Sequence, residues 1–274
     1  MSSPTQITVA QLSKLIGTPG APIIVDICID EDFQDDPRLI PTAFRHPFSD
    51  MAALAPKLQG ERVVIICQKG LKLSEGAAAV LRTHGIAAEN LEGGNVAWRD
   101  AGLPLIPATK LPKRHTNQQT IWVTRHRPKI DRIACPWLIR RFVDRDAQFL
   151  FVAPAEVMAV AEKFEATPFD VEGVFWSHRD DRCSFDTMIE EFALQTEPLK
   201  RLATIIRAAD TNRHDLAPEA AGLLAASLGL SRMYRDDLAQ LEAGMQLYDA
   251  FYRWARDATD ESHDWPSAIT RGQS

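Results

Sequence analysis

Residues 63–74 read Val-Val-Ile-Ile-Cys-Gln-Lys-Gly-Leu-Lys-Leu-Ser, and this stretch decides how the first part of the chain folds. Its first five residues are apolar and mostly β-branched, which is typical of a buried strand in a parallel sheet. A second run of this kind covers residues 23–27, and helical periodicity marks residues 51–58 and 74–83. Gly85 is well placed to end the second helix in a left-handed cap. Strands that alternate with helices predict an α/β domain with a parallel sheet flanked by helices.

Cys67 ends the strand in this stretch, and residues 68–73 form a predicted loop before the helix. Such a loop can turn successive backbone N–H groups inward as an anion-binding nest, and the following helix N-terminus adds positive potential. Gly70 provides backbone freedom, and Lys69 and Lys72 add positive charge. These features favour the thiolate, which is the nucleophilic form of cysteine. Cys67 is therefore the candidate catalytic nucleophile. The alternative is a buried, inert cysteine at a strand end.

The same stretch resembles the Cys-x-x-Gly-x-Arg active-site loop of the rhodanese family. Residues 91–104, Leu-Glu-Gly-Gly-Asn-Val-Ala-Trp-Arg-Asp-Ala-Gly-Leu-Pro, are similar to the closing motif of that family. Residues 24–26 and 40–43 match two further segments, so the resemblance covers residues 5–107. It implies a sulfurtransferase whose Cys67 carries a persulfide. The residues that it implies for binding the anionic substrate are Gln68, Lys69, Gly70, Leu71 and Lys72.

Two departures from the family pattern bear on the sulfur donor. Lys72 stands where the family usually has arginine, and lysine keeps the charge but loses the planar, bidentate grip on an oxyanion. Cys28 stands where an arginine commonly follows the early aspartate, here Asp26, which we expect to brace the loop. The donor is therefore left open between thiosulfate and a low-molecular-weight persulfide, with a thiol or cyanide as acceptor. A cysteine phosphatase is disfavoured, because Leu73 occupies the position where that class needs arginine.

A change in composition separates the first domain from a second one. Three prolines and the polar residues 113–120 interrupt the pattern and predict a linker at residues 108–119, between domains at 1–107 and 120–274. The second domain is predicted to begin with one or two strands and then to be mainly helical, so its predicted class is α+β. Amphipathic periodicity predicts helices at residues 184–192, 198–209, 218–228 and 238–252.

Three segments of the second domain resemble the C-terminal domain of chromate resistance protein B. They are Trp-Val-Thr-Arg-His-Arg-Pro-Lys-Ile-Asp-Arg-Ile-Ala-Cys-Pro-Trp-Leu-Ile-Arg-Arg-Phe at residues 122–142, His-Arg-Asp-Asp-Arg-Cys-Ser-Phe-Asp at 178–186 and Ile-Arg-Ala-Ala-Asp-Thr at 206–211. The resemblance implies a setting in chromate or oxyanion stress. In that family the domain can accompany a winged-helix DNA-binding region, but here a rhodanese-like domain precedes it, which disfavours direct control of transcription.

Polar residues of the second domain form a candidate metal site for zinc or iron. His178, Cys183 and Asp186 share one segment, and Asp210 follows a predicted helix. Neither Cys-x-x-Cys nor His-Glu-x-x-His spacing supports the site. Asp186 alternatively caps the helix, Cys183 alternatively fills the core, and Asp131 is expected to cap a helix or form an ion pair. Three functions follow: a sulfurtransferase in chromate resistance, a metal-dependent redox detoxification enzyme, or a non-catalytic chromate sensor.

Composition limits the partners and the compartment. The formal charge of −6 argues against a large nucleic-acid footprint, and the basic residues 110–115 are expected to be a solvated linker. No secretory signal and no membrane-spanning run is predicted. The four cysteines have no paired spacing, which predicts reduced thiols in the cytoplasm: Cys28, Cys67, Cys135 and Cys183. The oligomeric state is left open.

Overall fold

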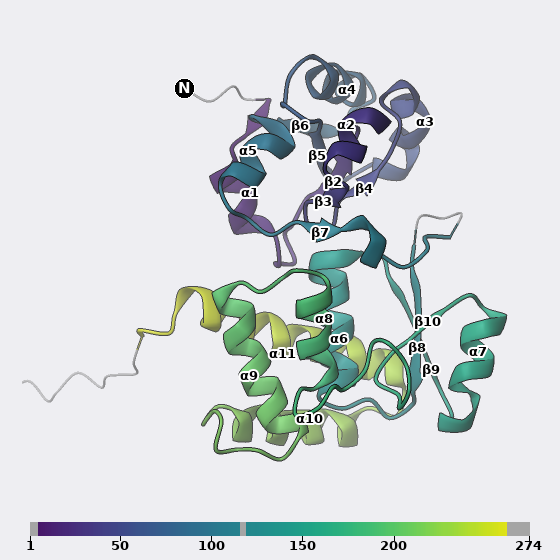
Figure 1. Ribbon diagram of the computed structural model, residues 1–274, viewed down its shortest axis with the longest axis vertical. Helices are drawn as coiled ribbons and strands as arrows, with labels where there is room; N and C mark the ends of the chain where they lie inside the picture. The colour runs from purple at the N-terminus through teal and green to yellow at the C-terminus, as the bar shows by residue number, and fades with distance from the viewer. Residues whose placement is uncertain (1–4, 116–118, 262–274) are drawn as a thin grey trace, which may run out of the picture.

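The computed structural model describes residues 5–115 and 119–261, which form two domains packed against each other (Figure 1). The first domain is built on a five-stranded sheet with the order β1-β6-β5-β2-β4, and every strand pair in it is parallel. This arrangement confirms the predicted α/β class. The strands are β1 (Gln6–Ile7), β2 (Ile23–Asp26), β4 (Phe44–Arg45), β5 (Arg62–Ile66) and β6 (Ala87–Leu91).

Alternate residues of β5 point to opposite faces of this sheet, so both faces are apolar. Val63 and Ile65 share a core with α3 and α4, whereas Val64 and Ile66 share a core with α1 and α5. The predicted uninterrupted apolar run is therefore a strand that is covered on both sides. The helices of this domain are α1 (Val9–Leu15), α2 (Asp30–Asp35), α3 (Met51–Leu54), α4 (Lys72–Thr83) and α5 (Gly94–Asp100).

Two predicted helices of the first domain differ from the structure. The helix after Cys67 begins at Lys72 rather than at residue 74, which shortens the loop to residues 68–71. The helix predicted at residues 51–58 becomes a 3-10 helix from Ala55 to Leu58, because Pro56 lacks the N–H that an α-helix would use. Gly85 has a φ of 78°, as its predicted role in a left-handed cap requires.

The second domain contains a small parallel sheet with the order β10-β8-β9. The sequence predicted only one or two strands here, because β10 is too short to produce a recognisable pattern. The strands are β8 (Ile121–Arg125), β9 (Gln148–Val152) and β10 (Thr167–Pro168), and α7 (Val157–Lys163) packs against β8.

Helices make up the rest of the second domain, as predicted. Helix α6 continues into a π-helical turn at Ile139–Val143. Trp137, the next-to-last residue of α6, is fully buried among aromatic rings. Helices α9, α10 and α11 pack against one another, and α11 also packs against α6 (Figure 1). The helices are α6 (Asp131–Leu138), α8 (Ser184–Glu191), α9 (Glu197–Asp210), α10 (Ala220–Met233) and α11 (Asp237–Asp257).

A continuous apolar core joins the two domains. A Cβ atom on Gly17 would lie 2.5 Å from Cζ of Phe142 and 2.8 Å from Cε1 of Tyr252, so the chain after α1 packs closely on the second domain. The backbone N–H of Thr42 donates to the carbonyl of Phe142 at 2.7 Å. The domains are therefore held in one arrangement by packing rather than connected only by a flexible spacer.

The basic stretch between the domains is ion-paired rather than simply solvated. Strand β7 (Ile106–Pro107) pairs antiparallel with β3 (Arg38–Leu39), and a 3-10 helix covers Ala108–Lys110. Three basic residues between positions 110 and 114 each form an ion pair with the second domain: Lys110 with Glu191 (2.6 Å), Lys113 with Glu165 (2.8 Å) and Arg114 with Asp144 (3.2 Å). Among the described helices, none has the length and apolar character needed to cross a membrane.

Candidate functional site

Cys67 lies directly after β5, at the carboxyl edge of the parallel sheet. Its side chain is 6% exposed, and its Sγ lies 3.2 Å from Oγ of Ser74 in the first part of α4. The Ser74 hydroxyl also lies 3.1 Å from the carbonyl oxygen of Leu71. The sulfur therefore faces the beginning of α4, where helix N–H groups and the helix dipole favour negative charge.

The loop after Cys67 exposes a row of backbone donors. Within the described chain, no hydrogen bond is donated by the backbone N–H groups of residues 68–71. Gly70 has a φ of 68°, and its carbonyl accepts a hydrogen bond from Nδ2 of Asn90 at 3.1 Å. This left-handed conformation curls the loop and favours glycine. Consecutive free N–H groups in a curled loop are the requirement for an anion-binding nest.

The predicted closing motif packs directly against this loop. Asn95 N donates to the carbonyl of Cys67 at 3.1 Å, and Val96 N donates to the carbonyl of Gln68 at 3.0 Å. Gly94 has a φ of 59°, and a Cβ atom there would lie only 2.2 Å from the carbonyl oxygen of Cys67. The two segments of the rhodanese resemblance therefore form one structural unit, in which the second segment holds the first in place.

Asp26 braces this unit, as the sequence predicted. It is buried, and its carboxylate accepts hydrogen bonds from the backbone N–H of Cys28 (2.9 Å) and from Nδ2 of Asn95 (2.8 Å). Burial and the nearby Asp26 carboxylate raise the pKa of the Cys28 thiol well above its ordinary value. Cys28 is therefore a protonated neighbour of the loop, whereas Cys67 lies beside the free donors.

The five residues predicted to bind substrate do not all lie in one place. Gln68 and Lys69 line a pocket of about 350 Å³ that Arg38 and Arg99 also line. Leu71 and Lys72 have exposed side chains at the beginning of α4, and Gly70 contributes backbone alone. Acidic side chains line the same pocket, and both arginines pair with aspartates, Arg38 with Asp36 and Arg99 with Asp36 and Asp100, so Lys69 is the basic side chain of this lining that has no carboxylate partner among the described residues. The Arg38 guanidinium is already engaged, and it lowers the pKa of Asp36.

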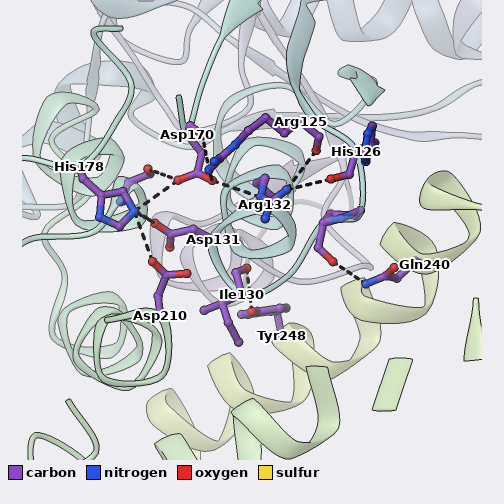
Figure 2. Close-up of polar contacts among 12 residues, drawn as sticks. Arg125, His126, Ile130, Asp131, Arg132, Asp170, His178, Asp210, Gln240 and Tyr248 are labelled. Atoms are coloured by element: carbon purple, nitrogen blue, oxygen red, sulfur yellow. Dashed lines mark hydrogen bonds and ion pairs between the residues drawn. The ribbon is translucent and has the colours of Figure 1, made fainter. Parts of the chain in front are cut away.

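A second polar cluster lies in the other domain, around the ring of His178 (Figure 2). We call Asp131, Asp170, His178 and Asp210 the His178 cluster. Nε2 of His178 lies 3.5 Å from Oδ2 of Asp131, 3.3 Å from Oδ1 of Asp170 and 3.3 Å from Oδ2 of Asp210. The ligand atoms of Asp131, Asp170 and His178 all lie within 4.8 Å of one another.

The topology of the small sheet brings two of these carboxylates together. Strands β8 and β10 are neighbours and parallel, so their carboxyl ends lie at the same edge. Asp131 begins α6 after β8, and Asp170 follows β10 by two residues. Asp210 is the last residue of α9, and His178 lies in the segment before α8. Four segments that are distant in the sequence therefore meet at one point.

Helix α11 holds the segment that precedes Asp131 (Figure 2). Nε2 of Gln240 donates to the carbonyl of Pro128 at 2.6 Å, and the Tyr248 hydroxyl donates to the carbonyl of Ile130 at 3.0 Å. Ile130 has a φ of 29°, which is unfavourable for a β-branched residue and requires support from its surroundings. The long helix therefore fixes the backbone from which the Asp131 side chain projects.

Arg132 holds the opposite side of the same segment. Its NH1 atom donates to the carbonyls of Arg125 and His126, at 3.3 and 2.9 Å. Its Nε lies 3.3 Å from Oδ2 of Asp170. The guanidinium thus connects the turn after β8 to the carboxylate that follows β10 (Figure 2).

The acids and the imidazole of the His178 cluster shift one another's proton affinity. Hydrogen bonds with Asp170 and Asp210 raise the pKa of His178 to about 10. Burial, together with the charges of Asp210 and Asp170, raises the pKa of Asp131 well above its usual range. Burial opposes ionisation of Asp170 as well, but hydrogen bonds from His178 and Ser184 outweigh it and lower the pKa of that carboxyl. The cluster strongly favours a positive charge at Nε2 of His178.

The structure brings together only two of the four predicted metal ligands, His178 and Asp210. Cys183 caps α8: its sulfur accepts from the backbone N–H of Asp186, and the Asp186 carboxylate accepts from its N–H at 3.1 Å. Asp186 also bonds to Arg207 at 2.9 Å. Burial raises the pKa values of the Cys183 and Cys135 thiols. Asp186 therefore caps α8, which was the alternative to its role as a metal ligand.

Two members of the cluster were not predicted as site residues. Asp131 was expected only to cap a helix or form an ion pair, and Asp170 was not singled out. The available signal was positional, because both residues follow strands that end at the same sheet edge. That signal required β10 to be recognised, and its two residues carry no periodic pattern.

Comparisons with known proteins give a family match within the second domain. Residues 122–255 match the family described as ChrB, C-terminal domain. Protein ChrB from Cupriavidus metallidurans is 32% identical over 170 residues, which are 62% of this chain and 45% of that protein. The chain therefore spans less than half the length of this curated relative. The second domain is of the ChrB C-terminal type.

The solved structures that resemble this chain each cover about a third of it. A rhodanese-like domain protein from Staphylococcus aureus is 29% identical and covers 34% of this chain and 90% of its own, with a TM-score of 0.30. Thiosulfate sulfurtransferase from Pseudomonas aeruginosa is 28% identical and covers 36% of this chain and 19% of its own, with a TM-score of 0.32. The strand order β1-β6-β5-β2-β4 and the Cys67 loop are the features that make the first domain rhodanese-like.

Proposed function

We propose that the first domain is a sulfurtransferase that carries sulfane sulfur on Cys67. The observation that carries this proposal is the row of backbone N–H groups in residues 68–71 that have no acceptor in the described chain, directly after Cys67, whose sulfur faces Ser74 of α4. These donors and the N-terminus of α4 would hold an anionic donor. The likeness to rhodanese-like proteins, one of them described as a thiosulfate sulfurtransferase, supports the same chemistry.

The proposed reaction has two balanced steps. The Cys67 thiolate attacks the outer sulfur of thiosulfate, the S–S bond breaks, and sulfite leaves with the bonding electron pair. Cyanide or a thiolate then takes the outer sulfur of the persulfide and restores the Cys67 thiolate. Lys69 lines the pocket beside the loop and provides a positive charge for the donor. A persulfide of low molecular weight is the alternative donor, because Lys72 lacks the bidentate grip of arginine.

Mass spectrometry of the intact chain after thiosulfate treatment tests the proposal. We expect a mass gain of one sulfur atom, located on the peptide that contains Cys67 and removed by cyanide with formation of thiocyanate. The peptides of the other three cysteines are internal controls, because all four thiols are free and buried in the same chain. Thiocyanate formation that is unchanged in the Cys67→Ser variant would refute the proposal.

We further propose that the chain acts in chromate resistance, in the cytoplasm, where its thiols stay reduced. The match of the second domain to the ChrB family supports this role. Deleting the gene in its host should lower the chromate concentration that stops growth, and the wild-type gene should restore it. Comparable restoration by Cys67→Ser would separate chromate resistance from sulfur transfer. Unchanged growth of the deletion strain would contradict the role itself.

A further inference from the structure

The His178 cluster has the properties of a metal centre, and its chemistry is separate from that of Cys67. We propose that His178 and the three carboxylates around it bind one divalent transition-metal ion. The site lies at the carboxyl edge of the β10-β8-β9 sheet, and the ends of α6 and α9 complete it (Figure 2).

One N–H group of His178 cannot satisfy three carboxylates, and the spacing of the ligand atoms also fits a shared cation. Nε2 of His178 lies 3.3–3.5 Å from one oxygen of each of three carboxylates. One N–H group carries one hydrogen, and hydrogen bonds of this type are usually about 2.7–3.2 Å long. Metal–ligand bonds of about 2.0–2.2 Å place neighbouring ligand atoms about 3–3.5 Å apart. The distances from Nε2 to the three oxygens therefore match those around one ion, and the ligand atoms of Asp131, Asp170 and His178 also lie within 4.8 Å of one another.

An unsatisfied buried oxygen is an independent indication of a missing partner. Asp131 is 1% exposed, and its Oδ1 atom has no hydrogen-bond partner of normal geometry among the described residues, although the Cys183 thiol lies close to the carboxylate. The Asp131 carboxylate points toward His178 and Asp210 (Figure 2). Buried carboxylate oxygens are normally hydrogen-bonded or bound to a metal, because an unpaired one is costly. A cation in the cluster would satisfy this atom.

The charges of the cluster also leave room for a dication. Asp170 pairs with two arginines, Arg125 and Arg132, each at 3.3 Å. In the described part of the chain, Asp131 and Asp210 pair with no arginine or lysine, and His178 is their only cationic partner. Converging carboxylates repel one another unless a positive charge lies between them. A divalent ion that replaces the proton on Nε2 of His178 would balance the two carboxylates that no arginine or lysine neutralises.

Ser184 orients the ligands from outside the cluster. Its backbone N–H donates to Oδ2 of Asp131 at 2.5 Å, and its hydroxyl donates to Oδ1 of Asp170 at 2.8 Å. Hydrogen bonds of this kind fix the ligands in metal sites. The His178 side chain is 42% exposed, so water or a substrate could reach the ion from the solvent side. An open position of this kind is typical of catalytic or sensory sites.

The donor set selects the class of metal. One imidazole and three carboxylates form a set rich in oxygen, which suits Mn(II) and Fe(II), whereas thiolate-containing sets select zinc and iron–sulfur centres. Cys183 and Cys135 lie close by, but Cys183 is committed to capping α8 and Cys135 is buried in α6. We therefore expect Mn(II) or Fe(II) rather than a thiolate-bound ion.

Titration of the full-length, chelator-treated protein with Mn(II) tests the site, because free Mn(II) is read directly by electron paramagnetic resonance. We expect one Mn(II) per chain in the wild type. The His178→Ala and Asp210→Asn variants should each bind at least about tenfold more weakly, since each removes one donor. His214→Ala is the matched control, because it removes an exposed histidine four residues from Asp210 and should bind like the wild type.

Thermal melting of the same proteins gives a second measurement that also checks folding. Mn(II) should raise the melting temperature of the wild type and of His214→Ala, and should leave that of Asp210→Asn almost unchanged. Absence of saturable Mn(II) and Fe(II) binding in the wild type would overturn the proposal. Equal Mn(II) affinity in folded Asp210→Asn and wild type would overturn it as well. Neither result depends on the chemistry of Cys67.

Discussion

Gly94 shows how a single residue without a side chain determines the Cys67 loop. Its φ is 59°, and a Cβ atom would lie 2.2 Å from the carbonyl oxygen of Cys67 and 2.5 Å from the backbone N of Gly70. Both neighbours are backbone atoms, which cannot move without moving the loop. The Gly-Gly sequence of the closing motif therefore serves the reactive loop, although 27 positions separate Gly94 from Cys67 in the chain.

We predict that Gly94→Ala displaces the loop and lowers the rate of persulfide formation at Cys67 by at least about tenfold, because a misplaced catalytic group is costly. The positive φ and the overlap should also destabilise the chain by about 2–4 kcal/mol. Gly102→Ala is the control, since Gly102 belongs to the same motif, has a φ of 68° and has no atom near its missing Cβ. Equal rates in the two variants would show that the contact does not position Cys67.

At the scale of elements, the sequence predicted the helices and strands that have a long apolar pattern. The buried strand β5 and the helices α9 and α11 follow from long apolar patterns, and the Cys67 loop follows from its place between a strand and a helix. The predicted beginning of α4 was two residues too late, because Ser74 lies inside the first turn of the helix, where its hydroxyl donates to the carbonyl of Leu71, and is not the first helical residue.

The His178 cluster shows where prediction from the sequence stops. Two of its members, His178 and Asp210, were selected by residue type, yet Cys183 and Asp186 were selected on the same basis and form a helix cap instead. Asp170 could not be found, because its position depends on how two-residue strand β10 pairs with β8. Residue type suggests ligands, but only the strand pairing determines which of them meet.

At the scale of the whole molecule, the two domains share one apolar core, although their chemistry is separate. Gly17 lies at this contact with a φ of 79°, and a Cβ atom would overlap the rings of Phe142 and Tyr252. The Arg256 guanidinium adds a hydrogen bond from α11 to the carbonyl of Lys14 at 3.1 Å. This packing predicts that the domains unfold together, because losing one would expose apolar surface on the other.

We therefore predict one calorimetric transition for the wild type, and a lower, broadened or divided transition for Gly17→Ala. Gly60→Ala is a closely matched control, because Gly60 also has a φ of 79° but no atom within 4 Å of the missing Cβ. Both variants incur the backbone penalty of about 1–2 kcal/mol, whereas only Gly17→Ala adds the overlap with two aromatic rings, about 1–3 kcal/mol. The difference between the variants thus measures the contact between the domains. If both lowered the melting temperature equally and kept a single transition, packing at Gly17 would not couple the domains.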